Sequence, residues 1–461
     1  MSEHALVVIG AGAGGLVIAV GAAKAGKKVL IIEKGKYGGD CTNFGCIPSK
    51  SLIASAHLAH SLKTARTLGI ELSSSTFGAS EALSRVREIV AGIRSHHEPK
   101  ELSELGIETL DGEASFQGPR TLKVGGREIN AKQIVIATGT SPRIPPIPGL
   151  SNTPYLTNET IFNLKEIPKT LAVLGGGPIG CELAQAFQRL GSQVFLIHSH
   201  DQLLNKEEPL AQETIAKQLT SEGMELFLGT HAKEVKYNNS FQISLENGKN
   251  VQADALLVAI GRKVNVKNLN LEAAGVTYSE NGIPTDRYGR TNQRHIWAIG
   301  DVTGPPFFTH LAENRARSVL TSLLLPFRKK LDDQAVPRVT FTDPEVASVG
   351  LLETEAAQKH TIATYIVPMS AIDRAITASK TEGFIKVVTK KWSSQILGCT
   401  IVAPRAGEML SEITLAMRAK ISLHKLSSLI HPYPTYSGAI RKAADLYLTQ
   451  TLLSILGRKK S

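Results

Sequence analysis

Two cysteines and a lysine stand close together near the N-terminus, in the segment Gly-Gly-Asp-Cys-Thr-Asn-Phe-Gly-Cys-Ile-Pro-Ser-Lys at 38–50. Cys41 and Cys46 are five positions apart with Gly45 between them, so only a kinked chain can bring the thiols together. The pair lies where a helix is expected to begin, and a helix N-terminus favours the thiolate, which is the reactive form. Lys50 follows Cys46 by four residues and should share its helix face. This spacing predicts a redox-active pair.

Metal binding is the main alternative use for such a pair. Zinc needs a second pair of ligands, which the segment lacks, so we predict no metal site. The other two cysteines, Cys181 and Cys399, form no pair in the sequence and are expected to be core residues. Four cysteines in 461 residues do not make a disulfide scaffold, which favours an intracellular protein.

Two glycine-rich segments repeat one pattern, Gly-x-Gly-x-x-Gly, about 165 residues apart. Each follows a buried apolar run, at 5–10 and at 170–174, and each precedes a predicted helix. A strand before and a helix after is the context in which this motif binds a dinucleotide, because the glycines let the backbone approach a pyrophosphate at the helix N-terminus. Two dinucleotide sites are therefore predicted, at Gly10, Gly12 and Gly15 and at Gly175, Gly177 and Gly180.

The strand after each helix ends in a different residue. Glu33 ends the strand predicted at 28–33, where a carboxylate accepts hydrogen bonds from an adenosine ribose. The same offset in the second copy leads to His198, and a missing carboxylate weakens the ribose grip that favours NAD. No arginine is near to bind a 2′-phosphate, although His200 and Lys206 are close in sequence. The second site is expected to take NADPH or NADH with a slight preference for NADPH, and an ordinary surface role for the histidines stays open.

The remaining sequence predicts an α/β protein of several domains, because 461 residues exceed one compact core. After about Pro337 the pattern changes to shorter alternating strands and helices, which indicates a third, α+β domain. A proline-rich stretch at 141–149 is predicted to be a linker, and a last helix is predicted at 438–456. The predicted division is 1–150 for the first dinucleotide, 151–281 for the second, 282–336 as a return to the first, and 337–461 for the α+β domain.

The formal net charge of +11 is spread along the chain in short clusters such as 328–330 and 458–460. Such a distribution favours a solvated basic surface over nucleic-acid binding, and the phosphates of two dinucleotides give positive charge a use. The apolar stretch 16–25 is too short to span a bilayer, and the N-terminus has no basic region typical of a signal peptide. We expect a cytoplasmic protein that does not bind nucleic acid and has no integral membrane association.

In these motifs the sequence strongly resembles the class I pyridine nucleotide–disulfide oxidoreductases, which include dihydrolipoyl dehydrogenase, glutathione reductase and mercuric reductase. The resemblance covers essentially the whole chain and implies FAD at the first glycine-rich segment and a nicotinamide dinucleotide at the second. It rests on Gly10–Gly15, Gly39–Lys50, Ala137–Gly139, Gly175–Glu182, Ala259–Arg262, Gly300–Asp301 and Pro337–Glu345.

The resemblance also implies roles for single residues. Cys46 would face the flavin as a thiolate, and Cys41 would exchange with substrate. Lys50 would pair with Glu182 beside the flavin, and Asp301 would lie on its ribityl or phosphate side. Further cofactor contacts are implied at Gly14, Lys34, Gly39, Lys50, Ala114, Thr138, Gly139, Gly261 and Ala312.

The C-terminal domain is implied to form a homodimer and to lend residues to the partner's active site, and here the chain departs from its relatives. Disulfide-reducing members carry His-x-His-Pro-Thr-x-x-Glu, in which the second His is the acid–base group and the Glu orients it. This chain has Tyr433 and Gly438 at those places, and His431, two positions early, is predicted to point elsewhere. A tyrosine here is similar to mercuric reductases and soluble transhydrogenases, but the vicinal cysteines that end true mercuric reductases are missing.

The sequence thus predicts a homodimeric FAD-dependent NAD(P)H oxidoreductase of the mercuric-reductase-like branch. Its catalytic residues would be Cys41, Cys46, Lys50, Glu182 and Tyr433, and its acceptor a metal ion, a quinone, a disulfide or a second nucleotide. Dihydrolipoyl dehydrogenase and soluble pyridine nucleotide transhydrogenase are alternatives within the family. A non-catalytic dinucleotide-binding or sensor protein is the alternative of another class, against which the intact cysteine pair argues.

Overall fold

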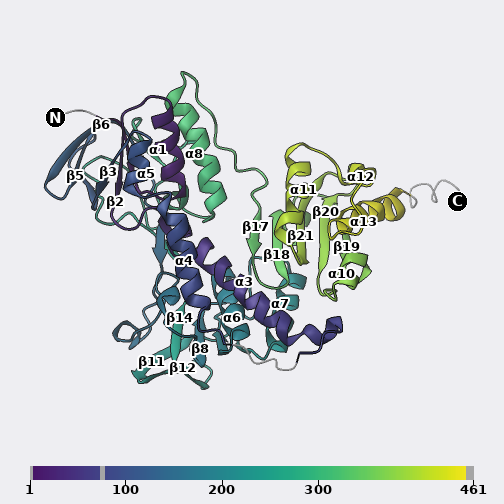
Figure 1. The fold of residues 1–461 in the computed structure, drawn as a ribbon. Coiled ribbons are helices and arrows are strands. Elements are labelled where there is room, and N and C mark those ends of the chain that lie inside the picture. The colour runs from purple at the N-terminus through teal and green to yellow at the C-terminus, as the bar shows by residue number, and fades with distance from the viewer. Residues whose placement is uncertain (1–3, 73–77, 453–461) are drawn as a thin grey trace.

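The computed structural model of the protein describes residues 4–72 and 78–452. Its strands form separate sheets, one near each end of the chain and others between them (Figure 1). The sheet of the last part is antiparallel, whereas the two largest sheets before it have parallel centres. The predicted α/β fold with a C-terminal α+β unit is therefore confirmed.

The first sheet has the strand order β3-β2-β1-β6-β5-β4, and β16 returns from far along the chain to pair with β6. Strand β1 is almost wholly buried and apolar, as expected for a parallel strand covered on both faces. Its strands are β1 (His4–Ile9), β2 (Val29–Glu33), β3 (Ile107–Asp111), β4 (Ala114–Phe116), β5 (Thr121–Val124), β6 (Arg127–Ile136) and β16 (Ile296–Ala298).

Helix α1 connects β1 to β2 and packs against α8. Small residues make this close approach possible, since a Cβ at Gly21 would lie 2.2 Å from Leu320 Cδ2. The helices of this part are α1 (Ala13–Lys24), α2 (Gly39–Asn43), α3 (Cys46–Lys63), α4 (Ala82–Ser95), α5 (Pro99–Glu104) and α8 (Thr309–Leu324).

The middle of the chain forms a parallel sheet of order β10-β9-β8-β14 and an antiparallel sheet of order β11-β12-β13. Helix α6 begins at Pro178, a position where a missing N–H is not needed. It packs against α3, so the helix that begins at Cys46 joins the two dinucleotide-type halves. The elements are β8 (Thr170–Leu174), α6 (Pro178–Arg189), β9 (Gln193–Ile197), α7 (Pro209–Ser221), β10 (Glu225–Phe227), β11 (Ala232–Asn238), β12 (Ser240–Leu245), β13 (Asn250–Ala253) and β14 (Ala255–Val258).

The C-terminal sheet is antiparallel with the order β17-β18-β21-β20-β19, and α11 packs on β18 and β21. Most of its buried side chains form a core of their own, whereas Val346, Phe384 and Val402 pack into the core of the middle part. The elements are β17 (Arg338–Thr340), β18 (Glu345–Gly350), α9 (Glu353–Ala357), β19 (Ile362–Pro368), α10 (Asp373–Thr377), β20 (Phe384–Lys390), β21 (Ile396–Ala403), α11 (Ala406–Arg418), α12 (Leu423–Leu426) and α13 (Gly438–Tyr447).

Two local predictions were right only in part. The predicted linker at 141–149 starts inside a strand, β7 (Thr140–Pro142), which pairs with β15 (Arg262–Val264). Strand β7 follows β6 of the first sheet and β15 follows β14 of the middle sheet, so this pair connects the two parts of the chain. The predicted last helix is α-helical only to Tyr447 and then forms a π-helical turn, Leu448–Leu452, while its predicted end lies outside the described residues.

We keep the predicted domain boundaries at 150, 281 and 336 as a proposal. Within the described ranges, none of the helices has the length and apolar character needed to cross a bilayer.

Candidate functional site

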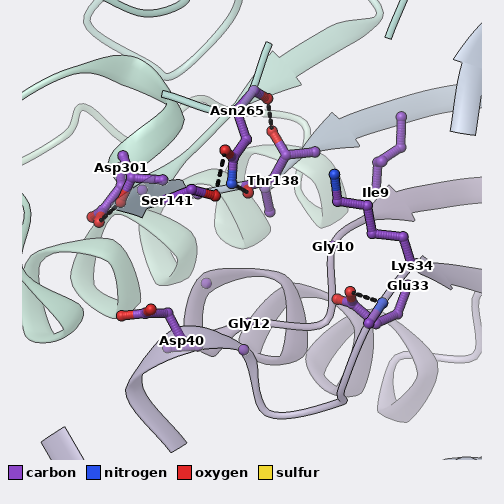
Figure 2. Close-up of a pocket in the computed structure, with 18 of the residues that line it drawn as sticks. Ile9, Gly10, Gly12, Glu33, Lys34, Asp40, Thr138, Ser141, Asn265 and Asp301 are labelled. Atoms are coloured by element: carbon purple, nitrogen blue, oxygen red, sulfur yellow. Dashed lines mark hydrogen bonds between the residues drawn. The ribbon is translucent and has the colours of Figure 1, made fainter. Parts of the chain in front are cut away.

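A cavity of about 430 Å³ lies where β1, β2 and β6 end, beside the N-terminus of α1 (Figure 2). The residues that line it come from the first glycine-rich segment and from distant segments, so the first sheet gathers them at one edge. Among the residues predicted to bind cofactor or substrate, those on its wall are Gly10, Gly12, Gly14, Glu33, Lys34, Gly39, Cys41, Ala114, Thr138, Gly139, Asp301 and Ala312.

The three glycines of the first motif have different tasks. Gly10 has φ +106°, and a Cβ there would lie 2.4 Å from the carbonyl oxygen of Ala137. A Cβ at Gly15 would lie 2.0 Å from the carbonyl oxygen of Gly10, so Gly15 packs the helix onto the strand and does not line the cavity. A Cβ at Gly12 would meet nothing nearer than Gly39 Cα at 3.8 Å. Gly12 therefore leaves open the space at the helix N-terminus where a diphosphate binds.

Glu33 ends β2 and lies at the cavity edge, as Figure 2 shows. Its Oε2 accepts a hydrogen bond from the backbone N–H of Ala11 at 2.7 Å, and its Oε1 accepts one from Gly35 at 2.8 Å. Two backbone donors fix the carboxylate at the cavity wall, and each oxygen keeps a further lone pair. A carboxylate held in this way can accept hydrogen bonds from ribose hydroxyls.

Asn265 is a cavity residue that the sequence reasoning missed. Its backbone oxygen accepts a hydrogen bond from Thr138 Oγ1 at 2.7 Å, and its Oδ1 accepts one from Ser141 Oγ at 2.8 Å (Figure 2). Its side-chain amide donates to the Thr138 carbonyl at 3.0 Å. Asn265 thus holds the Ala137–Gly139 turn in place from a strand end far away in sequence.

A second group that the sequence did not indicate links Asp301 to the segment 38–50, which contains Cys41 and Cys46 and is called the redox segment below. Thr140 Oγ1 donates to Asp301 Oδ2 at 2.9 Å and accepts from Arg262 Nε at 2.7 Å. Arg262 also forms an ion pair with Asp40 at 3.1 Å. Burial raises the pKa of Asp301, while Thr140 and Arg262 oppose the rise. One guanidinium therefore connects two carboxylates on the cavity wall.

The two thiols are unequal. Cys46 is the first residue of α3, whereas Cys41 lies in the separate short helix α2. The pKa of Cys46 is lowered to about 6, chiefly because the Cys41 side chain hydrogen-bonds to its sulfur, with further lowering by Thr309 and Lys50. That same contact, together with burial, raises the pKa of Cys41. These opposite shifts favour a thiolate at Cys46 and a protonated thiol at Cys41.

Thr309 is another residue near the cysteines that was not among the site residues predicted from the sequence. It begins α8, and its Oγ1 lies 3.7 Å from Cys46 Sγ. Thr309 lines the cavity, as does Cys41, whereas Cys46 is not part of the wall. Position on the wall would make Cys41 the cavity-facing thiol, but charge makes Cys46 the thiolate. The role of Cys46 as the thiolate that faces the flavin therefore stays a prediction.

Lys50 and Glu182 meet as predicted. Lys50 Nζ lies 2.7 Å from Glu182 Oε2, and the other carboxylate oxygen accepts a hydrogen bond from the backbone N–H of Phe341 at 2.9 Å. The ammonium also lies 4.3 Å from the centre of the Phe341 ring. Glu182 is buried and Lys50 is partly exposed, so the ion pair is shielded from water on the carboxylate side and joins α3, α6 and the start of the C-terminal unit.

The second glycine-rich segment repeats the geometry of the first. Gly175 has φ +121°, and a Cβ there would lie 2.4 Å from the Ala259 carbonyl oxygen. A Cβ at Gly180 would lie 1.8 Å from the Gly175 carbonyl oxygen, while one at Gly177 would meet nothing within 4 Å. The chain can therefore hold a second diphosphate at the N-terminus of α6. Gly261, predicted to contact cofactor, is not on the wall of the described cavity; its carbonyl oxygen accepts from Arg143.

His198 takes the place of the acid at this second site. Its Nδ1 accepts a hydrogen bond from the backbone N–H of Gly176 at 3.1 Å, and its ring stacks on His200 with centroids 5.0 Å apart. Burial, followed by His200 and His231, lowers the pKa of His198. The neutral ring therefore carries its proton on Nε2, which is buried and has no hydrogen-bond partner among the described residues. An orphaned donor of this kind suits a ligand oxygen.

The C-terminal residues are placed far from the cysteines within one chain. Tyr433 is 78% exposed, and its hydroxyl donates to Asp373 Oδ2 at 2.9 Å, which raises the pKa of the phenol. His431 points elsewhere: Nε2 faces Glu412 Oε1 at 3.0 Å and Nδ1 faces the Leu429 carbonyl at 3.1 Å. Each of its nitrogens faces an oxygen, so the ring is engaged within its own chain.

Comparison with known proteins agrees with this geometry. The family model described as pyridine nucleotide-disulphide oxidoreductase matches residues 4–319, and the model of its dimerisation domain matches residues 336–444. A mercuric reductase from Lysinibacillus sphaericus is 35% identical over 96% of this chain and 82% of its own length. A dihydrolipoyl dehydrogenase from Chlamydia muridarum is 37% identical over 95% of this chain and 96% of its own length.

Solved structures give the same result. The HOCl-induced flavoprotein disulfide reductase RclA from Escherichia coli superposes with a TM-score of 0.87 at 31% identity, over 96% of this chain and 99% of that one. A Cu(II) complex of the same reductase gives 0.88, with 97% and 100% covered. Members of the family use FAD and NAD(P)H, and the open glycine cradles, the fixed Glu33 and the cavity fit these two cofactors. The chain therefore belongs to the pyridine nucleotide–disulphide oxidoreductase family, as an oxidoreductase with a dimerisation domain.

Proposed function

We propose that the protein is an NAD(P)H-dependent reductase whose acceptor is a thiophilic metal ion, and that two copies pair through the dimerisation domain to form the site. The observation that carries this proposal is the hydrogen bond from Tyr433 to Asp373. Tyr433 occupies the position at which the disulfide-reducing members that the sequence resembles have an imidazole. A phenol whose proton is held by a carboxylate, and whose pKa is raised, is a poor donor to a leaving thiolate. A metal ion bound by thiolates needs no such proton transfer.

Bound FAD would carry two electrons from NAD(P)H to the Cys41–Cys46 disulfide. The hydride brings two electrons and one proton, so reduction leaves a thiolate at Cys46 and a thiol at Cys41. The Lys50 ammonium, shielded with Glu182, stabilises negative charge beside the pair. The chain's own contribution is thus to place the charge on one sulfur and the proton on the other.

The acceptor step reverses this change. A divalent ion such as Hg(II) takes both electrons, the two sulfurs re-form their bond, and the proton of Cys41 passes to water. Soft thiolates select such ions over harder cations. Relatives named mercuric reductase and the Cu(II) complex of RclA support the proposal.

The roles of the two cysteines can be tested by absorbance. Cys46→Ser should abolish the long-wavelength thiolate-to-flavin band of the two-electron-reduced enzyme. Cys41→Ser should show that band even without reductant, because Cys46 then carries a thiolate permanently. The reverse pattern would mean that position on the cavity wall, and not charge, decides which thiol faces the flavin.

The acceptor is tested with a panel of Hg(II), Cu(II), quinones, lipoamide, glutathione disulfide and thio-NAD. Metal ions should be reduced efficiently, and disulfides slowly, because positioned acid–base groups are worth about 10²–10⁴ in rate. Tyr433→His with Gly438→Glu should raise disulfide reduction more than the two single changes combined, and it should leave metal reduction less affected. Disulfide turnover near roughly 10²–10³ per second by the unchanged protein would refute the proposal.

Dihydrolipoyl dehydrogenase is the second candidate, favoured by relatives of that name that match nearly their whole length. Efficient lipoamide turnover in the same panel would select it. NADPH or NADH remains open as donor, with the His198 donor favouring a phosphate oxygen of NADPH. A cytoplasmic location stays a prediction.

A further inference from the structure

The loop that follows α8 exposes two apolar side chains next to three basic ones. Leu325 is 46% exposed and Phe327 is 61% exposed, and Arg328, Lys329 and Lys330 follow directly and are exposed. In Figure 1 the chain leaves α8 at the top of the picture before it turns back toward β17. Single exposed apolar side chains are common on this protein, but here two of them lie two positions apart at one tip and adjoin a basic run, so the tip is both apolar and positively charged.

The loop has a fixed shape. The Ser322 hydroxyl accepts a hydrogen bond from the backbone N–H of Lys329 at 2.9 Å and lies 3.3 Å from its carbonyl oxygen. The backbone N–H of Leu331 donates to the Arg287 carbonyl oxygen at 2.8 Å. These bonds hold the loop against the turn at 286–290, so the exposure of Phe327 is built into the fold.

More basic residues converge on the same place from that turn. Arg287 and Arg328 lie 5.1 and 5.8 Å from the centre of the Tyr288 ring. Arg290 is near enough to Arg328 for the two charges to interact, and its Nε is buried without a hydrogen-bond partner within the described ranges. Arg294 adds to this positive charge.

Nearby carboxylates offset the charge of the cluster only in part: Asp286 attracts Arg290, and Asp332 attracts Lys329. Asp286 accepts hydrogen bonds from the backbone N–H groups of Tyr288 and Arg290. Asp333 pairs with Arg315, and Asp332 pairs with Arg418. In the part of the chain that the structure describes, Arg287, Arg290 and Arg328 form no ion pair. The loop therefore presents an apolar tip with an excess of positive charge around it, since Asp286 and Asp332 offset only part of the charge of Arg287, Arg290, Arg294 and residues 328–330.

We propose that this surface docks on an anionic lipid bilayer. Phe327 and Leu325 would enter the headgroup–acyl boundary, while the basic residues contact lipid phosphates. Nucleic acid would also attract the charge, but an aliphatic Leu325 gains nothing from base stacking and does gain from the acyl boundary. The site lies at the end of α8 opposite to Thr309, about 24 Å along a 16-residue helix, so it is separate from the redox pair.

Co-sedimentation of the FAD-loaded protein with vesicles tests the proposal. Vesicles of phosphatidylcholine with about a third phosphatidylglycerol should bind the protein, and pure phosphatidylcholine vesicles should not. Arg328→Gln with Lys329→Gln and Lys330→Gln should weaken binding at least about tenfold, since each basic residue near such a surface contributes separately. Leu325→Ser with Phe327→Ser, which keeps the charge, should also weaken it.

The matched control removes three exposed lysines from the middle of the chain, as Lys165→Gln, Lys169→Gln and Lys233→Gln. It has the same net charge as the triple variant and should bind vesicles like the unchanged protein. All variants should keep FAD and NAD(P)H oxidation. The proposal fails if the control weakens binding equally, if the Leu325/Phe327 variant binds unchanged, or if the loop variants alter only nucleic-acid binding or oligomeric state.

Discussion

The two glycine-rich segments have almost the same backbone conformation, but the strand that follows each of them ends in a different kind of side chain. Gly12 and Gly177, which precede α1 and α6, have φ of −83° and −82° and the same ψ of −176°. Both third glycines pack against the carbonyl oxygen of the first. In each copy the residue between the first two glycines, Ala11 or Gly176, donates its backbone N–H to a side chain 22 positions later. That side chain is Glu33 in the first copy and His198 in the second.

This difference separates two parts of dinucleotide recognition. The backbone binds the diphosphate, which all such cofactors share, so it is repeated with little change. The side chain at the strand end meets the ribose, where cofactors differ, so a carboxylate acceptor in one copy can be a neutral donor in the other. The segments that follow β2 and β9 also differ. The chain continues from β2 into the redox segment and from β9 into a loop that contains His198 and His200.

The largest expected effect comes from adding a methyl group at the third glycine of each copy. Gly15→Ala should lower FAD affinity, and Gly180→Ala should lower NAD(P)H affinity while the protein stays yellow. Forcing atoms into such tight contacts costs about 1–3 kcal/mol, or about 10–100-fold in affinity. FAD retention on gel filtration and stopped-flow reduction measure the two. Equal loss of FAD in both variants would break the separation of the two sites.

The strand-end residue should decide nucleotide choice. His198→Glu copies the first site into the second, so it should shift preference toward NADH by about 10–100-fold, because a carboxylate accepts from the 2′-hydroxyl and repels a 2′-phosphate. His198→Gln, which keeps an acceptor for Gly176, is the control. The unchanged protein should discriminate by less than about three orders of magnitude, roughly 4 kcal/mol. Ratios of kcat/KM for the two donors give the answer, and no shift in the glutamate variant would mean that another residue selects.

The redox segment predicts a smaller, pH-dependent effect. Since the pKa of Cys46 is lowered to about 6, its thiolate is present above that pH and is lost as pH falls through it. The charge-transfer absorbance of the reduced enzyme should follow this titration. Thr309→Val should move the midpoint upward by less than about one unit, because one hydrogen bond contributes about 1 kcal/mol. Thr321→Val, at the other end of α8, should leave the midpoint unchanged.

The smallest effect is expected for the cysteine of the second copy. Cys181 is fully buried in α6, its thiol donates to the Gly176 carbonyl at 3.4 Å, and burial raises its pKa. Cys181→Ala should therefore lower the free energy of unfolding by about 1 kcal/mol and leave the charge-transfer band intact. Loss of that band would mean that α6 carries redox chemistry too.

The sequence by itself determined the parts that depend on local pattern. Glycine spacing between an apolar run and a helix is enough to predict a dinucleotide cradle, and two cysteines flanking Gly45 are enough to predict a reactive pair, because both rest on the backbone of a few consecutive residues. The family is indicated by the same segments, and the comparisons confirm it.

Only the tertiary structure decided which distant groups complete the site. Thr309 reaches Cys46 across 263 positions, Asn265 holds Thr138 across 127, and Asp373 accepts a hydrogen bond from the Tyr433 hydroxyl across 60. None of these contacts has a local signal, since each is made where strands and helices from different parts of the chain end together. Predicting them requires the packing of the whole fold, because a hydrogen bond depends on positions known to a few tenths of an ångström and a sequence pattern fixes only the local backbone.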